Sequence, residues 1–171
     1  MQGFVQVYTG DGKGKTTAVL GLALRAAGAG LNVYIGQFIK NTEYSEIKAL
    51  QRFADCITLE QFGRGCFLLT APSQADIDAA RQGLATLHRA LASGAYDLVI
   101  ADEANVAVAL QLLSEDDLLA LIDRRPPQVE LVLTGRGALP RVLERADLVT
   151  EMRLVKHYYD RGVLARKGIE G

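Results

Sequence analysis

The segment Thr9-Gly10-Asp11-Gly12-Lys13-Gly14-Lys15-Thr16-Thr17 decides the fold of this 171-residue chain. The apolar run Phe4–Tyr8 precedes it and predicts a strand, and the Ala- and Leu-rich run Thr16–Ala29 follows it and predicts a helix. A glycine-rich turn between a strand and a helix is the context in which a phosphate-binding P-loop occurs. Its glycines let backbone N–H groups curl around phosphate oxygens, and the helix N-terminus adds the positive end of its dipole. The segment therefore predicts a phosphate site.

Two side chains of this loop carry the expected chemistry. Lys15 supplies a mobile positive charge for phosphate, and Thr16 supplies a hydroxyl for Mg²⁺. The loop departs from the usual motif because Thr9 stands five residues before Gly14, where a glycine is usual, and Gly10 comes one residue late. A glycine-rich turn without a ligand is the alternative, which the Gly-Lys-Thr-Thr run disfavours. The predicted phosphate ligands are Thr9, Gly10, Asp11, Gly12, Lys13, Gly14, Lys15, Thr16 and Thr17.

Strand-like and helical patterns alternate along the rest of the chain. Further strands are predicted at Val33–Ile39, Cys56–Gln61, Leu98–Ala101, Val129–Thr134 and Leu148–Met152. Helices are predicted at Ser45–Arg52, from a capping box at Ser73 to Ser93, from a cap at Ser114 to Pro126, and at Leu139–Arg145. The strands are nearly continuous apolar runs, as expected for strands buried on both faces. The predicted fold is α/β and P-loop NTPase-like (RecA-like), with a mainly parallel sheet and helices on both faces.

Length, composition and charge narrow the class of protein. A chain of 171 residues fits one domain, which is predicted to span residues 1–171. The composition, with 49% hydrophobic and 23% charged residues, excludes a disordered chain. No run of 18 apolar residues and no signal-peptide pattern occurs, so we expect a cytoplasmic protein without membrane spans. A net charge of −1 disfavours a nucleic-acid binder. The stretch from Arg153 to Gly171 carries five basic and two acidic residues, which suits either an anion contact or a solvated tail.

A second part of the site is predicted where two later strands end. The run Tyr96–Glu103 is an apolar strand that ends in Asp102 and Glu103, like the acidic strand that accompanies a P-loop. Two carboxylates after a strand can also cap a helix, but beside a P-loop they indicate Mg²⁺ binding with Thr16. The sequence leaves open which carboxylate contacts the ion, and whether Glu103 binds metal or activates water. Arg136 follows the strand ending at Thr134 and either faces a ligand or is a surface arginine.

Segments along the whole chain carry a family resemblance. Besides the loop, they are Gln37-Phe38-Ile39-Lys40, Tyr96–Glu103, Thr134-Gly135-Arg136, Ala146–Met152, Val155-Lys156-His157 and Gly168-Ile169-Glu170. In this order and spacing, from about Val5 to Glu170, they resemble the P-loop type of ATP:corrinoid adenosyltransferases, enzymes of cobalamin biosynthesis and salvage. The shortened loop, together with the Thr-Glu-Met and Lys-His segments, makes the resemblance specific to that family.

The resemblance implies a reaction and a set of roles. A corrinoid substrate reduced to Co(I) attacks the 5′-carbon of the co-substrate ATP, and inorganic triphosphate leaves. The nucleotide lies reversed in the loop, so Gly12–Thr17 hold the triphosphate. Thr16 and Glu103 bind Mg²⁺ with Asp102 in support, Arg25 lies near the nucleotide, and Lys15 and Glu103 are the candidate catalytic residues. An electron-donating reductase, such as a flavoprotein, and a second copy of the chain in a homodimer are the implied protein partners.

The chain departs from the family pattern where the corrinoid is expected to bind. The family holds Co(II) corrinoid without its lower axial ligand against apolar side chains, for which longer relatives have a Gly-x-Gly-Phe-x-Trp segment. This chain has Gly63-Arg64-Gly65-Cys66-Phe67-Leu68 and no tryptophan, so Phe62, Phe67 and Leu68 are expected to form the apolar seat. Longer relatives also cover the site with an N-terminal extension, whereas this sequence begins at its first strand. We therefore expect closure over the corrinoid to be either weaker or built differently.

Two other functions fit a P-loop fold. A nucleoside kinase of the thymidine-kinase type shares this core, but it usually carries a four-cysteine zinc site, and the chain has two cysteines. A non-enzymatic ATP-binding regulatory module is the second alternative. The products formed from ATP distinguish the three functions, because they release triphosphate, ADP or nothing.

Overall fold

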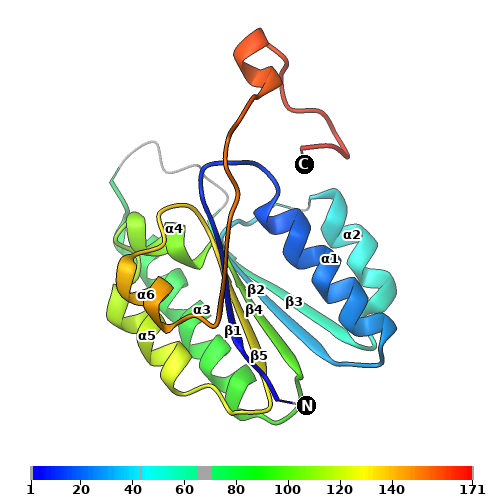
Figure 1. Ribbon diagram of the computed structural model, residues 1–171, viewed down its shortest axis with the longest axis vertical. Coiled ribbons are helices and arrows are strands. Elements are labelled where there is room, and N and C mark those ends of the chain that lie inside the picture. Colours follow the sequence, from blue (N-terminus) through cyan, green and yellow to red (C-terminus); the bar gives the residue numbers. More distant parts are fainter. Residues whose placement is uncertain (1, 43, 65–70, 171) are drawn as a thin grey trace.

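A single parallel sheet organises residues 2–42, 44–64 and 71–170, which are the part of the chain described by the computed structural model. Within that part, its strands are β1 (Val5–Thr9), β2 (Val33–Ile39), β3 (Ile57–Gly63), β4 (Leu98–Asp102), β5 (Glu130–Thr134) and β6 (Leu148–Glu151). They are ordered β3-β2-β4-β5-β1-β6, and every neighbouring pair is parallel. All the carboxyl ends therefore meet at one edge of the sheet, which is the upper edge in Figure 1.

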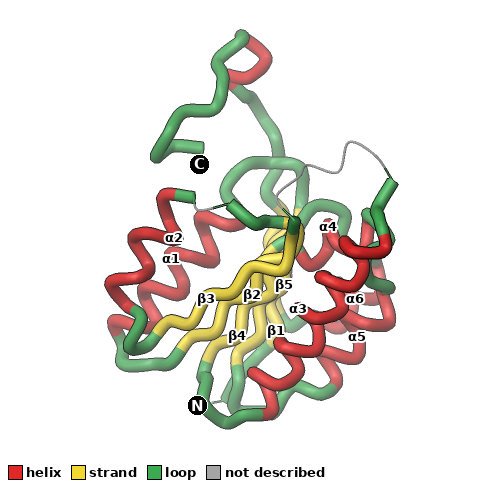
Figure 2. Tube along the Cα trace, turned by 180° about the vertical axis from the view of Figure 1, so that it is seen from behind, coloured by secondary structure: helices red, strands yellow, loops and turns green. Residues whose placement is uncertain are grey.

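Helices cover both faces of this sheet. They are α1 (Lys15–Gly28), α2 (Ser45–Leu50), α3 (Gln74–Ala92), α4 (Ala104–Ala109), α5 (Glu115–Asp123) and α6 (Pro140–Arg145). Helices α1 and α2 lie on one face, and α3 to α6 lie on the other (Figures 1 and 2). The predicted α/β fold with a parallel sheet between helical layers is confirmed.

The apolar core forms two layers, one on each face of the sheet. Val19 and Ala23 of α1 pack with Ile35 and Ile100 on one face, and the larger cluster on the other face includes Leu87 and lies under α3 and α5. Strands β4 and β5 are buried almost throughout, as their apolar runs predict. Burial on both faces is a wrong expectation for β6, where all four residues are exposed because the strand lies at the sheet edge.

Local sequence signals set several helix boundaries. Ser73 with Asp76 and Ser114 with Asp117 form reciprocal capping boxes, which start α3 and α5 as predicted. The predicted helix Ser45–Arg52 is α2, which continues as the 3₁₀ turn η1 (Gln51–Phe53). Helix α4 was not predicted, because six residues are too few for the 3.6-residue periodicity to show.

The chain continues after β6 as a C-terminal segment, residues 152–170, that rises above the carboxyl edge of the sheet (orange and red in Figure 1). It contains the 3₁₀ turn η2 (Tyr158–Arg161). The segment forms three hydrogen bonds with the phosphate loop. Met152 N donates to Thr9 O (2.9 Å), Gly12 N donates to Met152 O (2.7 Å) and Lys13 Nζ donates to Ile169 O (3.1 Å). None of the described helices is both long and apolar enough to cross a membrane.

Candidate nucleotide and metal site

The glycines of the phosphate loop fit both its curvature and its close packing. Gly10 and Gly14 adopt φ angles of 89° and 117°, in the left-handed region that disfavours other residues. Gly12 needs its missing side chain for another reason, because a Cβ there would lie 2.6 Å from Met152 O. Glycine backbone conformations therefore allow the curvature of the loop, and the start of the C-terminal segment packs against it.

Lys15 points into this loop. It is buried, and its Nζ donates to Gly10 O (2.6 Å) and Gly12 O (2.7 Å). Burial, and next the Arg136 guanidinium, lower the pKa of Lys15. Phosphate oxygens are stronger acceptors for an ammonium than neutral carbonyls, so the geometry suits transfer of Lys15 from the loop carbonyls to a phosphate.

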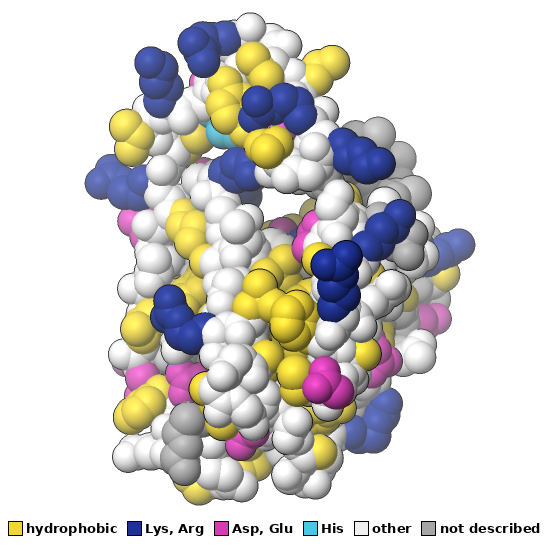
Figure 3. Space-filling view, turned by 90° about the vertical axis from the view of Figure 1, so that its right-hand side faces the viewer, with side chains coloured by type: hydrophobic (Ala, Val, Ile, Leu, Met, Phe, Trp, Pro, Cys, Tyr) yellow, Lys and Arg dark blue, Asp and Glu magenta, His cyan; other side chains and the backbone are white. Residues whose placement is uncertain are grey.

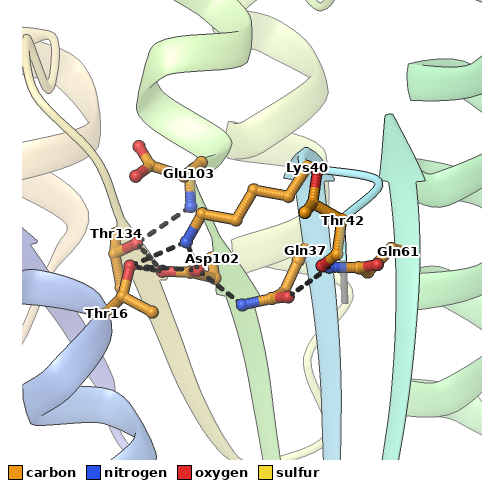
Figure 4. A network of polar contacts seen from close by, with 8 residues as sticks. All are labelled: Thr16, Gln37, Lys40, Thr42, Gln61, Asp102, Glu103 and Thr134. Carbon is orange, nitrogen blue, oxygen red and sulfur yellow. Dashed lines mark hydrogen bonds and ion pairs between the residues drawn. The ribbon is translucent and has the colours of Figure 1, made fainter. Parts of the chain in front are cut away.

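Asp102 is the centre of a polar network at the carboxyl edge of the sheet (Figure 4). Its carboxylate is fully buried and accepts hydrogen bonds from Thr16 Oγ1 (3.1 Å), Gln37 Nε2 (3.1 Å) and Thr134 Oγ1 (2.7 Å). Lys40 Nζ completes the set at 2.9 Å from Asp102 Oδ2. Burial opposes the charge of Lys40, but the Asp102 carboxylate outweighs it and raises the pKa of Lys40. Four donors from three segments far apart in sequence thus converge on one carboxylate.

Glu103 lies beside this network in a different environment. It precedes α4 with φ 60°, a left-handed conformation uncommon outside glycine, and its backbone N–H donates to Thr134 Oγ1 (2.9 Å). Figure 4 shows its carboxylate directed away from Asp102. Burial, and next the Asp102 carboxylate, raise the pKa of Glu103. The two carboxylates are therefore adjacent in sequence but occupy separate positions.

The donors at this edge fit a magnesium ion that shares its ligands with phosphate. Mg²⁺ is commonly held by one or two carboxylates, with phosphate oxygens and water completing an octahedron. Thr16, Asp102 and Glu103 supply one hydroxyl and two carboxylates next to the phosphate loop. Within the described ranges, no group of three or more His, Cys, Asp or Glu side chains forms a metal cluster. The hydroxyl and the two carboxylates fit a metal ion whose other ligands are phosphate oxygens and water.

Arg136 and Arg25 occupy different parts of the molecule. A pocket of about 320 Å³ beside the loop is lined by Asp11, Lys13, Arg136, Leu154, His157, Tyr159 and Asp160. Figure 3 shows Lys and Arg side chains gathered around a hollow below the C-terminal segment. Arg25 lies in the last turn of α1, about 15 Å along the helix axis from Lys15 at 1.5 Å per residue. Arg136 therefore joins the loop, whereas the nucleotide contact of Arg25 stays a prediction.

The predicted corrinoid seat is only partly within the described residues. Phe62 is 8% exposed, and its ring packs 6.3 Å from that of Phe38 and against Gly83, where a Cβ would lie 2.6 Å from Phe62 Cγ. Phe62 therefore serves the core in this structure. Phe67 and Leu68 lie outside the described residues.

Sequence reasoning missed four polar residues at this edge. Gln37, Lys40 and Thr134 were quoted only as parts of family segments, yet all three contact Asp102. The sequence signal that could have found them is their position near the carboxyl end of a strand, since Gln37 lies two residues before the end of β2, Lys40 follows β2 and Thr134 ends β5. Asn105 is also buried there, and its side-chain amide has no hydrogen-bond partner within the described part of the chain.

Comparisons with known proteins agree on one family. The family model described as "ATP:corrinoid adenosyltransferase BtuR/CobO/CobP" matches residues 1–171. A corrinoid adenosyltransferase of Pseudomonas aeruginosa is 38% identical over 170 residues, which cover 99% of this chain and 84% of the relative. The enzyme of that name from Escherichia coli K12 is 37% identical, with 99% and 86% covered, and one from Salmonella typhimurium is 36% identical with the same coverage.

A solved structure supports the fold alone. A KaiC-like protein from Pyrococcus horikoshii OT3 superimposes with a TM-score of 0.60 and 17% sequence identity. The match covers 88% of this chain and 73% of that one. The likeness supports the predicted RecA-like arrangement of the sheet and carries no statement about substrate.

Proposed function

The chain belongs to the ATP:corrinoid adenosyltransferase family, and from this premise we propose how its residues act. The enzyme transfers the 5′-deoxyadenosyl group of ATP to the cobalt of a reduced corrinoid and releases inorganic triphosphate. The observation that carries this function is a family match over the whole chain, on a fold in which a glycine-rich loop joins β1 to α1. No finding favours a nucleoside kinase or a regulatory ATP-binding module.

The reaction needs alignment and charge stabilisation rather than a protein nucleophile. The Co(I) electron pair forms the Co–C bond as the bond between the 5′-carbon and oxygen of ATP breaks, and the bonding pair leaves with the triphosphate. The protein must hold cobalt and carbon in line and stabilise the negative charge of the leaving group. We propose Lys15 and the loop amides for the second task, together with Lys13 and Arg136. The support is that Lys15 points into the loop and that Lys13 and Arg136 line the adjoining pocket.

Thr16, Glu103 and Asp102 are the proposed holders of Mg²⁺. The support is that one hydroxyl and two carboxylates lie at the strand ends next to the loop. When bound there, Mg²⁺ neutralises part of the charge on the triphosphate. Glu103 acts as a ligand in this proposal, and the reaction leaves it no water to activate.

The corrinoid is proposed to rest on Phe67 and Leu68. The support is that these two residues follow β3 in the sequence, and that the carboxyl end of β3 lies at the same sheet edge as the phosphate loop. Replacing both by Ala should spare the rate with pre-reduced Co(I) corrinoid and slow the reaction that starts from Co(II) with a physiological reductant. Equal losses in the two assays, or a lower melting temperature alone, would assign these side chains to packing.

The remaining partners are also proposals. Because the corrinoid must be in the Co(I) state, an electron-donating reductase, such as a flavoprotein, has to supply the electron that reduces Co(II). A homodimer and a cytoplasmic location accord with the family resemblance. Light scattering on the purified protein tests the dimer, and a reductase-coupled assay tests the electron donor.

Product analysis tests the function itself. The protein is incubated with ATP, Mg²⁺ and chemically reduced corrinoid, and the nucleotide products are separated by anion-exchange chromatography. We expect triphosphate and adenosylcorrinoid in equal amounts. Formation of ADP would favour a kinase, and the absence of turnover with retained ATP binding would favour a regulatory module.

A further inference from the structure

A lysine ammonium lies among the proposed metal ligands. Lys40 Nζ is 2.9 Å from Asp102 Oδ2 and 3.0 Å from Thr16 Oγ1, so one cation contacts both a carboxylate and the hydroxyl proposed to bind Mg²⁺ (Figure 4). The Lys40 side chain is only 18% exposed. The contacts with Asp102 and Thr16 therefore hold the Lys40 side chain in place, unlike a lysine on the open surface.

A strained turn places Lys40 there. Ile39 ends β2 with φ 68°, which is an outlier for a β-branched residue, and Lys40 N donates to Phe38 O (2.7 Å) across it. The neighbouring strand accommodates this turn through Gly63, where a Cβ would lie 2.0 Å from Ile39 O. Strain of this kind persists where the surroundings enforce it, and it concentrates at functional sites. The turn directs Lys40 back toward the carboxyl edge of β4.

Lys40 is the cation that balances Asp102. A fully buried carboxylate is unfavourable unless it is paired and hydrogen-bonded. The other three donors, from Thr16, Gln37 and Thr134, are neutral, so they satisfy oxygens without balancing the charge. Lys40 supplies the balancing charge, which a metal ion at the same ligands would supply in its place.

We propose that Lys40 is an internal counter-cation, which neutralises Asp102 in the nucleotide-free protein and gives up that position when Mg²⁺ enters with ATP. The inference rests on the proposed metal site. Mg²⁺ binds oxygen at 2.0–2.1 Å, so an ion on Thr16 and Asp102 would repel an ammonium at its present position. The displaced ammonium, tethered next to the phosphate loop, contacts the triphosphate instead. Metal and nucleotide binding are thereby coupled.

Metal binding without nucleotide tests this inference. Mn²⁺ alone is titrated into the nucleotide-free protein and followed by electron paramagnetic resonance. Because Lys40→Met removes the competing charge, we expect it to bind Mn²⁺ about tenfold or more tightly than the unsubstituted protein. Mg²⁺ should also raise the melting temperature of Lys40→Met more than that of the unsubstituted protein, since a ligand of the folded state stabilises it.

Matched variants isolate the cause. Lys48→Met removes an exposed lysine from α2 and should leave Mn²⁺ affinity unchanged. Adding Asp102→Asn to Lys40→Met should abolish the gain, because the carboxylate that attracts the ion is lost. If Lys40→Met does not fold, Lys40→Gln keeps a donor for Asp102 without the charge, and the same gain is expected.

Two results separate this inference from the proposed function. Mn²⁺ affinity unchanged in both Lys40 variants, with triphosphate still released by the unsubstituted enzyme, would make Lys40 a purely structural ion-pair partner and overturn only this inference. Failure of the unsubstituted enzyme to release triphosphate would instead overturn the proposed function.

Discussion

The phosphate loop has two neighbours of opposite character. On one side is the Asp102 network, in which Asp102, Gln37 and Thr134 are fully buried and held by donors from separate strands. On the other side is the C-terminal segment, residues 152–170, in which Val155 is 94% and Leu164 is 75% exposed. Both touch the same loop, but only the first has its geometry fixed by the core.

The difference in burial indicates that the two regions have different roles. Breaking a buried ion pair such as Lys40–Asp102 by removing one partner typically destabilises a protein by about 3–5 kcal/mol. In the Arg166–Glu170 pair of the C-terminal segment the Arg166 side chain is 53% exposed, so water screens the attraction between the two charges. We infer that the network fixes the charges that act on ATP, and that the C-terminal segment can move as substrates enter and leave.

We expect the largest loss of activity for Lys15→Ala, which removes the lysine that points into the phosphate loop. Loss of one preorganised charge-stabilising group lowers turnover by about a hundredfold or more. The melting temperature should change little, because the two hydrogen bonds that Lys15 Nζ donates go to carbonyls of its own loop, Gly10 O and Gly12 O. Lys167→Ala, on the exposed C-terminal segment, is the matched control and should stay close to full activity. The measurement is the steady-state rate of each variant at saturating ATP and Mg²⁺. Near-full activity of Lys15→Ala would refute the proposal that Lys15 stabilises charge on the triphosphate.

Glu103→Gln should give a smaller loss with a distinct signature. The substitution keeps the shape of the side chain and removes one ligand charge, so the Mg²⁺ concentration for half-maximal rate should rise. Excess Mg²⁺ should then restore part of the activity. Rates measured over a Mg²⁺ series check this. A variant that traps ATP with unchanged metal dependence would indicate that Glu103 is a hydrolytic base.

Gly12→Ala probes the junction between the loop and the C-terminal segment. The new Cβ would lie 2.6 Å from Met152 O, so the segment must move off the loop. Overpacking of this kind typically lowers stability by about 1–3 kcal/mol. We expect faster proteolysis within residues 153–170 and a modest fall in melting temperature. Gly28→Ala, where the added Cβ meets open space, is the control. Unchanged proteolysis would mean that this contact does not hold the segment.

The smallest expected effect is a pH dependence confined to the C-terminal segment. Hydrogen bonds from Arg166 and Tyr158 lower the pKa of Glu170 from 4.5 to about 2. Because the folded pKa lies below the unfolded one, the contact is fully favourable above pH 4.5 and is lost as the pH falls toward 2. Carboxyl ¹³C NMR of Glu170 should show this depressed midpoint. A midpoint at 4.5 would show that the contact does not persist in solution.

The sequence predicted the loop and the acidic strand end because both are local patterns. Thr16 and Asp102 are 86 residues apart, yet a loop before a helix and an acid after a buried strand suffice to pair them. Lys40 was not assigned a role, because its contact depends on β2 lying beside β4 and on the left-handed turn at Ile39. Strand order and a strained φ angle arise from long-range packing, which one sequence does not display.

Binding of inorganic tripolyphosphate tests the central claim most directly, since the loop is proposed to hold the leaving triphosphate. Isothermal titration in the presence of Mg²⁺ compares the unsubstituted protein with Lys15→Ala. We predict that the unsubstituted protein binds tripolyphosphate and that Lys15→Ala binds it about tenfold or more weakly, because a charge-assisted contact is lost. Equal affinity of the two proteins would contradict the claim that the triphosphate occupies this loop.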